Sequence, residues 1–366
     1  MIFVLLGAIQ AESFKLHVLF TNNIHGAIHE GPARFINPEF SPDLAGGAGA
    51  MSYVNTLRDE SKVDGDFVLL TDAGNIFQGT PLGTSDGGSK IIKWMNWLGY
   101  DALVPGVRDF DQGVKNLARL NEEAEFPFLA ANLKGVDGII PHKVLEFGSI
   151  KIGLIGLITP FISDGLLPEN YEGVEISPLI ETLNDEVAEL KNQVDLVFVL
   201  CHLGIPYNRE IEYKKFIEKI NEGESIEIKN AIELAHFTES VDMIITGGFS
   251  KGYNTPWIDP NTHAIVVQNY GSLTGIGHLT LNIDQDKKVI KDYSFPTDRG
   301  MLVNLFTDDV WADKAMADTI KNWVNNAKKE KDLDYSEKIS SIGNNNCNMQ
   351  IKSTYSNYTI PKLGTN

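Results

Sequence analysis

The 366-residue sequence contains only two cysteines and no apolar run of transmembrane length. So few cysteines exclude a disulfide-framed fold and a cysteine-rich metal site. Basic residues are also scarce, because 31 Lys and Arg stand against 49 Asp and Glu, for a formal net charge of −18. A chain this acidic repels phosphate backbones and anionic lipid, so we expect no nucleic-acid partner and no membrane span or membrane-surface partner.

The first twelve residues resemble the remnant of a secretory signal peptide. Ile2 to Ile9 are apolar, and small or polar residues follow them. This pattern favours a secreted, periplasmic or extracellular location, where Cys201 and Cys347 could form a disulfide. Two alternatives remain: Ile2 to Ile9 would also suit a buried strand, and the apolar neighbours of Cys201 are typical of a buried thiol.

Short apolar runs alternate with amphipathic stretches along the chain. The runs predict strands at Leu16–Thr21, Phe67–Thr71, Ala102–Pro105, Ile150–Leu157, Leu196–Cys201, Val241–Thr246 and Ala264–Gln268. Gly277–Ile283 and Val289–Phe295 predict a hairpin. The predicted helices are Ala50–Glu60, Lys90–Leu98, Gln112–Ala124, Leu179–Gln193, Lys214–Lys219 and Asp308–Lys331. This alternation predicts an α/β fold whose polar site residues lie at the carboxyl ends of strands.

Five predicted strand ends carry clusters of polar residues and glycine. In chain order they read T-N-N-I-H-G at 21–26, T-D-A-G-N at 71–75, P-G-V-R-D-F-D at 105–111, C-H-L-G at 201–204 and G-G-F-S-K at 247–251. Any one cluster would suit an ordinary turn, because glycine after a strand usually serves the turn itself. The order and spacing of all five clusters together indicate a functional site far more specifically than any single cluster does.

Together the clusters resemble the motifs of the secreted and periplasmic 5′-nucleotidases of the calcineurin-like metallophosphoesterase superfamily. Those motifs run T-N-D-x-H, D-A-G-D, G-N-H-E-F-D, H-x-G and G-G-H-S, and the resemblance covers roughly residues 15–300. It implies a four-layer α/β/β/α sandwich around two mixed sheets. For an active relative it also implies two divalent metals, such as Zn or Mn, which hold the hydroxide that attacks a phosphate ester.

The chain departs from the family pattern at most positions that would hold metal. Histidines are retained at His25 and His202, and the aspartate that orients the catalytic histidine is retained as Asp111. The altered positions are Asn23 and Asn75 for aspartates, Val107 for asparagine, Arg108 for the catalytic histidine, Phe249 for histidine and Lys251 for a later polar ligand.

These replacements weaken any attraction for metal. Asn23 and Asn75 carry no charge to balance two dications, whereas Arg108 and Lys251 each add a positive charge. Like unit charges about 4 Å apart repel by roughly 4 kcal/mol at an effective dielectric near 20. We therefore expect no metal and no other cofactor.

One hypothesis is that Arg108 and Lys251 fill the vacated metal positions, where they would pair with Asp111 or Asp72. With His25 and His202 they could instead capture phosphate or another small anion. A structural ion pair is the alternative to anion binding.

The predicted domains are a signal-peptide remnant (1–12), a metallophosphoesterase-like domain (13–305), a linker helix (306–332) and a polar tail (333–366). The tail resembles the start of a missing C-terminal nucleotide-binding domain. The predicted function is that of a pseudoenzyme with a binding or assembly role, whose partner is an unidentified protein or a second copy. The alternative is a weak or single-metal phosphoesterase that uses His25, His202 and Asp111.

Overall fold

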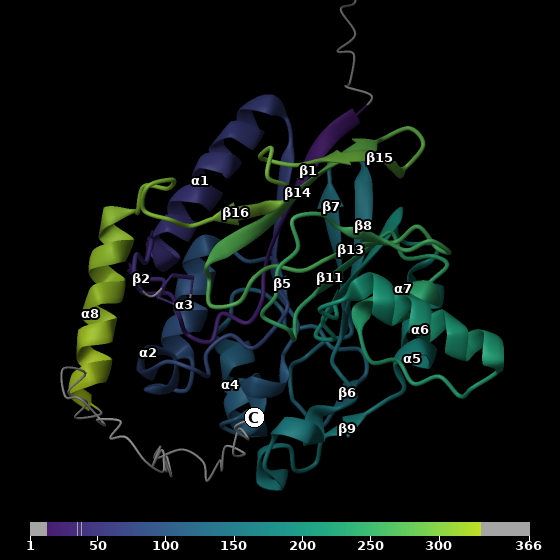
Figure 1. Cartoon of the computed structure of the whole chain (residues 1–366), viewed down its shortest axis with the longest axis horizontal. Coiled ribbons are helices and arrows are strands. Elements are labelled where there is room, and N and C mark those ends of the chain that lie inside the picture. Colours follow the sequence, from purple (N-terminus) through teal and green to yellow (C-terminus); the bar gives the residue numbers. More distant parts are fainter. Residues whose placement is uncertain (1–12, 35, 38, 331–366) are drawn as a thin grey trace, which may run out of the picture. The chain divides into compact units, whose positions relative to one another are not determined.

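Two six-stranded β-sheets lie at the centre of the computed structural model, which describes residues 13–34, 36–37 and 39–330 (Figure 1). The predicted signal-peptide remnant, the polar tail and Cys347 lie outside these residues. Cys201 is fully buried, and burial raises the pKa of its thiol to about 12. It is therefore a thiol of the core, as the apolar run around it predicted.

The first sheet is built around β1 (Ser13–Thr21), whose last four residues are all buried. β1 pairs antiparallel with β14 (Gly275–Asp284) and parallel with β4 (Phe67–Asp72). The order is β15-β14-β1-β4-β5, with β16 also paired to β14. The remaining bounds are β5 Ala102–Leu103, β15 Val289–Ser294 and β16 Leu302–Asn304.

The second sheet has the order β12-β13-β11-β10-β8-β7. Its four inner strands run parallel, and β12 and β7 pair antiparallel at the two edges. The bounds are β12 Trp257–Ile258, β13 Ile265–Val267, β11 Met243–Thr246, β10 Leu196–Cys201, β8 Ile150–Leu157 and β7 His142–Phe147. Two small two-stranded sheets join β2 (Gly31–Pro32) to β3 (Asp43–Leu44) and β6 (Leu133–Lys134) to β9 (Glu175–Ile176).

Helices cover the outer face of each sheet, as Figure 1 shows. Against the first sheet lie α1 Gly46–Asp64, α2 Pro81–Thr84, α3 Ser89–Leu98, α4 Val114–Glu123 and α8 Lys314–Glu330. Against the second lie α5 Leu179–Leu190, α6 Arg209–Glu222 and α7 Ala231–His236. Short 3₁₀ helices are η1 Val107–Phe110, η2 Ile162–Gly165 and η3 Pro168–Asn170.

Three separate apolar clusters fill the spaces between these layers. In β1, Leu16, Val18 and Phe20 point into the cluster between the sheets, whereas Leu19 points into the cluster under the helices of the first sheet. This period of two is what a strand buried on both faces requires. The predicted four-layer α/β/β/α sandwich with two mixed sheets is confirmed.

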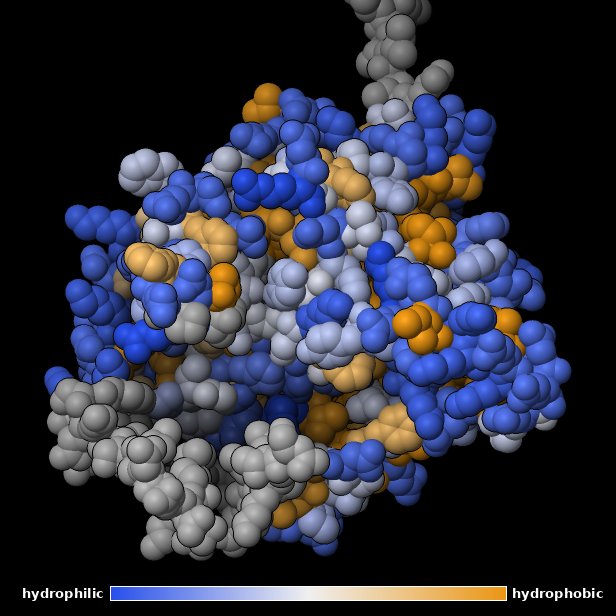
Figure 2. Space-filling view, in the orientation of Figure 1, coloured by the Kyte–Doolittle hydropathy of each residue, from blue (hydrophilic) through white to orange (hydrophobic). Residues whose placement is uncertain are grey.

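Helix α8 contributes to the first of these clusters. It begins at Lys314, six residues later than predicted, and Met316 and Ile320 are buried against α1 and α2. The helix predicted as a linker thus packs on the body of the fold, while the domain limits themselves stay predictions. Hydrophilic residues cover most of the face drawn in Figure 2. No helix among the described residues is long and apolar enough to cross a membrane.

Candidate functional site at the strand ends

The five polar clusters meet where strands of both sheets end. Loops after β1 and β4 of the first sheet contact loops after β10 and β11 of the second. His202, after β10, donates a 2.5 Å hydrogen bond from Nδ1 to the carbonyl oxygen of Ala73, after β4. The backbone N–H of Gly248 donates to Oδ1 of Asn23 at 3.0 Å. The sequence prediction that these clusters form one site is therefore consistent with the structure.

Left-handed backbone shapes the first two loops. Asn23, His25 and Asn75 have φ values of 51°, 53° and 64°. Asparagine enters this region more readily than most residues because its short polar side chain can bond locally. Asparagine therefore suits the left-handed turns at both Asn23 and Asn75.

The amide oxygens of both asparagines already accept backbone hydrogen bonds. Asn75 Oδ1 accepts from the N–H of Arg108 at 2.8 Å. Asn23 Oδ1 accepts from Gly248, and Asn23 Nδ2 donates back to the oxygen of Gly248 at 3.4 Å. Both side chains are almost completely buried. They link neighbouring loops to each other.

A buried carboxylate that the sequence prediction missed stands at the centre of the third loop. Asp109 is fully buried and accepts hydrogen bonds from the backbone N–H groups of Asn75, Ile76 and Gly106 at 2.7, 2.8 and 2.8 Å. Burial raises its pKa to about 6 despite these bonds. Its signal in the sequence was an acidic residue at the glutamate position of the third motif.

A second buried carboxylate, Asp72, lies at the end of β4. It accepts hydrogen bonds from the hydroxyl of Thr21 at 2.6 Å and the N–H of Gly74 at 2.7 Å. Burial raises its pKa to about 7, and the neighbouring Asp109 adds to the rise. No ion pair joins Asp72 to Arg108 among the described residues, so one of the two partners proposed for Arg108 is not used.

The two cations predicted to share the pocket bind separate groups. Arg108 Nη1 donates to the carbonyl oxygen of Gly165 at 2.9 Å and lies 3.5 Å from Asp111 Oδ1. Lys251 Nζ donates to the carbonyl oxygen of Tyr207 at 2.9 Å and lies 5.0 Å from the ring centres of Tyr207 and Tyr253. The structure therefore pairs Arg108 with Asp111, whereas Lys251 binds Tyr207 and neither predicted carboxylate.

The two retained histidines are neutral acceptors toward the site. The Nδ1 atom of His25 bonds the carbonyl oxygen of Gln78 at 2.9 Å, so Nδ1 carries the proton. Burial lowers the pKa of both imidazoles, for His202 to about 4, and the proximity of His25 lowers that of His202 further. Neither histidine adds positive charge for an anion at neutral pH.

A cavity of about 470 Å³ opens over these loops. Val107, His202 and Phe249 line it from three of the clusters, while Asn23, Asn75, Arg108 and Lys251 do not. The residues that complete its walls are Thr159, Phe161, Asp164, Leu203, Glu227, Lys229 and Gly248. Most of these lie outside the five motifs, so motif spacing alone gave no signal for them.

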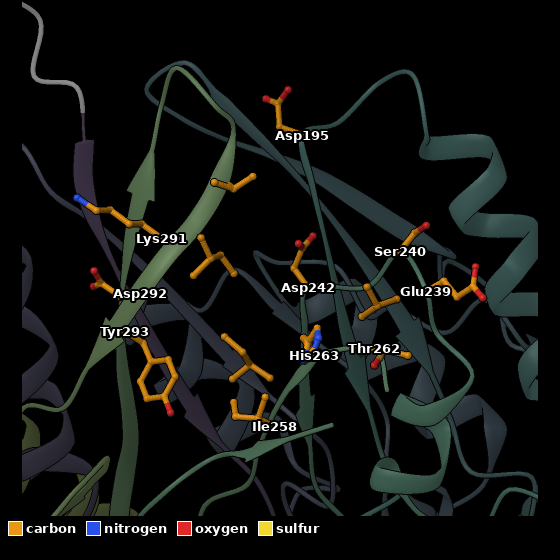
Figure 3. A pocket seen from close by; sticks show the side chains of 14 residues that line it. Asp195, Glu239, Ser240, Asp242, Ile258, Thr262, His263, Lys291, Asp292 and Tyr293 are labelled. Atoms are coloured by element: carbon orange, nitrogen blue, oxygen red, sulfur yellow. The ribbon is translucent and has the colours of Figure 1, made fainter. Parts of the chain in front are cut away.

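A larger cavity of about 570 Å³ lies at the amino ends of the second sheet's strands, beside β15 (Figure 3). Two of its carboxylates have structural partners: Asp195 pairs with Lys288 at 2.8 Å, and Asp242 accepts from the N–H of Val197 at 2.8 Å. It holds none of the five clusters. The chemistry predicted from the motifs thus concerns the other end of the sheet.

Comparison with known proteins first defines the class. The structure matches the 5′-nucleotidase precursor of Thermus thermophilus with a TM-score of 0.67 at 21% identity, over 86% of this chain and 59% of that one. It matches a calcineurin-like phosphoesterase of Bacillus subtilis with a TM-score of 0.66 at 21% identity, over 87% of this chain and 98% of that one. The fold is therefore that of the calcineurin-like metallophosphoesterases.

In sequence, the chain is similar to several 5′-nucleotidases. The chain is 28% identical over 318 residues to the snake venom 5′-nucleotidase of Gloydius brevicauda, covering 79% of this chain and 49% of that protein. It is 32% identical over 220 residues to human 5′-nucleotidase, covering 56% and 36%. No family model matches. The chain is thus similar to the 5′-nucleotidases, and it spans about half the length of the curated relatives it matches.

The donor set does not fit the two metals that this family implies. Among the described residues, no group of three or more His, Cys, Asp or Glu side chains is placed to hold a metal ion. The Nε2 atom of His202 is an available acceptor, and that of His25 lies 3.4 Å from Nδ2 of Asn23. Val107 and Phe249 have no ligating atom. No chemical step through a metal is therefore derived for this site.

Proposed function

We propose that this chain is a secreted 5′-nucleotidase homologue without a working dimetal centre, which serves a non-catalytic binding or assembly role. The observation that carries the proposal is the use of both amide oxygens at the aspartate positions. Asn75 Oδ1 accepts from Arg108 and Asn23 Oδ1 accepts from Gly248. The atoms that would have to ligate metal are thus engaged in holding the loops together, and neither carries charge.

The charges around the site support the same proposal. A dimetal phosphoesterase needs anionic oxygen ligands to balance the ions and to keep a hydroxide between them. Arg108 replaces an acid–base group by a guanidinium that stays protonated at neutral pH. That guanidinium is bonded to Gly165 and Asp111 rather than free to donate a proton. Hydrolysis therefore lacks both its nucleophile and its acid.

Metal content tests this proposal. The purified chain would be loaded with Zn²⁺ and Mn²⁺, freed of unbound metal and examined by mass spectrometry, beside a snake venom 5′-nucleotidase treated identically. We expect close to zero ions in this chain and bound metal in the venom enzyme. One or two tightly held ions in the wild-type chain, with hydrolysis of 5′-AMP that a chelator removes, would refute the proposal.

A restored variant provides the matched gain-of-function arm. It carries Asn23→Asp, Asn75→Asp, Val107→Asn, Arg108→His and Phe249→His, which return the family residues to the first, second, third and fifth clusters. We expect it to retain metal where the wild-type chain does not, and its melting temperature to rise when Mn²⁺ is added. The wild-type result decides the proposal even where the variant folds poorly.

The second candidate function is that of a single-metal phosphoesterase. It is favoured by the two neighbouring imidazoles of His25 and His202, which are both neutral and both bonded through Nδ1. Against it, the third predicted ligand, Asp111, lies beside the Arg108 guanidinium. Hydrolysis of p-nitrophenyl phosphate that needs one equivalent of metal and is lost in His202→Ala would favour this function.

A further inference from the structure

Apolar side chains form much of the wall of the 470 Å³ cavity at the strand ends. Val107 and Phe249, which replace family ligands, are joined there by Phe161 and Leu203. The cavity therefore offers a partly apolar and aromatic surface beside its charged residues. Such a surface gains free energy by covering an apolar ligand face.

The ring of Phe249 is held in place as part of this wall. A Cβ on Gly204 would lie 2.4 Å from Cδ2 of Phe249, so the ring rests directly on the backbone of Gly204. Gly204 also has a φ of +76°, which favours glycine. Tyr207 lies beyond, with its ring centre 6.4 Å from that of Phe249. Phe249 nevertheless keeps 41% of its surface exposed, so one part of the ring is free for a ligand.

One polar acceptor in the cavity lacks a partner. His202 lines the cavity and is only 4% exposed, and its Nδ1 is bonded to Ala73. No group in the described part of the chain hydrogen-bonds its Nε2. This nitrogen faces the open cavity, so a ligand that displaces water from it keeps its affinity only by supplying an N–H or O–H in the water's place.

Charge argues against an anion as the occupant. Arg108 and Lys251 do not line the cavity and are bonded to backbone oxygens elsewhere. The lining itself carries both Lys229 and the carboxylates Asp164 and Glu227. The anion site predicted from the sequence thus has no concentrated positive charge.

We propose that this cavity binds a neutral aromatic molecule, whose ring lies against Phe249 and whose N–H or O–H donates to Nε2 of His202. The inference rests on the proposed function, because a metal ion would occupy the same nitrogen. The ligand class is defined by one flat apolar face and one hydrogen-bond donor.

Phenol and toluene test this ligand class because they have nearly the same shape and differ in the donor. Their binding to the full chain would be followed by ligand-detected NMR, with inorganic phosphate as a third probe. We expect phenol to bind saturably with a dissociation constant of about 1 mM or lower. Toluene should bind at least about fivefold more weakly than phenol, because it cannot donate a hydrogen bond. Phosphate should neither bind at this affinity nor displace phenol.

A matched pair of variants locates the site. Phe249→Ala removes the proposed wall, and we expect it to weaken phenol binding about fivefold or more. Phe295→Ala is the control: Phe295 is 37% exposed, and its ring lies 5.8 Å from that of Tyr293. It should bind phenol as the wild type does. Both substitutions lie at partly exposed positions, and a melting curve of each variant verifies that it is folded.

Three results would overturn the inference: equal affinity for phenol and toluene, unchanged phenol binding in Phe249→Ala, or displacement of phenol by phosphate. Each is distinct from failure of the proposed function, which metal content decides. A metal-free chain that does not discriminate phenol from toluene loses only the inference. A chain that holds metal loses the proposed function whatever phenol does.

Discussion

Replacement of Asp109 by asparagine should lower the stability of the protein although it hardly changes the shape of the side chain. Its carboxylate accepts three backbone N–H groups from two loops, at Asn75, Ile76 and Gly106. The substitution Asp109→Asn keeps the volume and planarity of the side chain. It replaces one acceptor oxygen by an NH₂ group, which must then face a backbone donor.

The size of the effect follows from the count of these bonds. The amide oxygen can serve the two donors that now bond Oδ2, Asn75 and Gly106, so the N–H of Ile76 loses its acceptor. A lost hydrogen bond to a charged group is worth about 1.5–3 kcal/mol, and an unsatisfied buried donor about 1–3 kcal/mol. Part of this lost unfolding free energy is offset, because the substitution also removes a buried charge. We therefore expect a net loss of about 2–4 kcal/mol of unfolding free energy.

Urea unfolding at pH 7.5, followed by circular dichroism, measures this loss directly. Asp286→Asn is the control, because Asp286 is exposed in the turn between β14 and β15. It should change stability by no more than about 0.5 kcal/mol. If Asp109→Asn unfolds within that same margin of the wild type, the carboxylate is not what joins the second and third loops, and the account of this site is wrong.

Three further outcomes are expected. Burial lowers the pKa of His278 to about 3, while the unfolded residue takes up its proton near 6.5, so stability falls as the pH drops below 6.5. Between about pH 7.5 and 5 the wild type should lose about 2 kcal/mol more than His278→Gln in urea titrations. Arg108→Ala should change stability by about 1 kcal/mol or less, because that side chain is 39% exposed. Gly204→Ala should lower the melting temperature and weaken phenol binding together, since its Cβ would displace Phe249.

Much of the fold was predictable because parallel strands buried on both faces leave continuous apolar runs. β8 and β10 occur with the predicted bounds, Ile150–Leu157 and Leu196–Cys201. β7 was missed because it is an edge strand whose sequence, H-K-V-L-E-F at 142–147, has neither a continuous apolar run nor a regular alternation. Helix α7 was missed because its six residues, Ala231–His236, are too few to establish a helical period.

The site was predictable to the extent that its contacts are local. Arg108 and Asp111 are three residues apart on one short turn, so their pairing could be anticipated. The partner of Lys251 could not, because Tyr207 comes from a loop 44 residues away and reaches the ammonium only after the second sheet has formed. The walls of the cavity depend on tertiary packing in the same way. Motif spacing therefore identified the five loops of the site but not most of the residues that line the cavity above them.

The side chain of Asn23 joins two loops of the site that come from different sheets. Its amide bonds Gly248 in both directions, with Oδ1 as acceptor at 3.0 Å and Nδ2 as donor at 3.4 Å. An aspartate could make only the first of these bonds, and its charge would be buried beside the oxygen of Gly248. The asparagine thus links the loop after β1 to the loop after β11 directly, through both of its amide atoms.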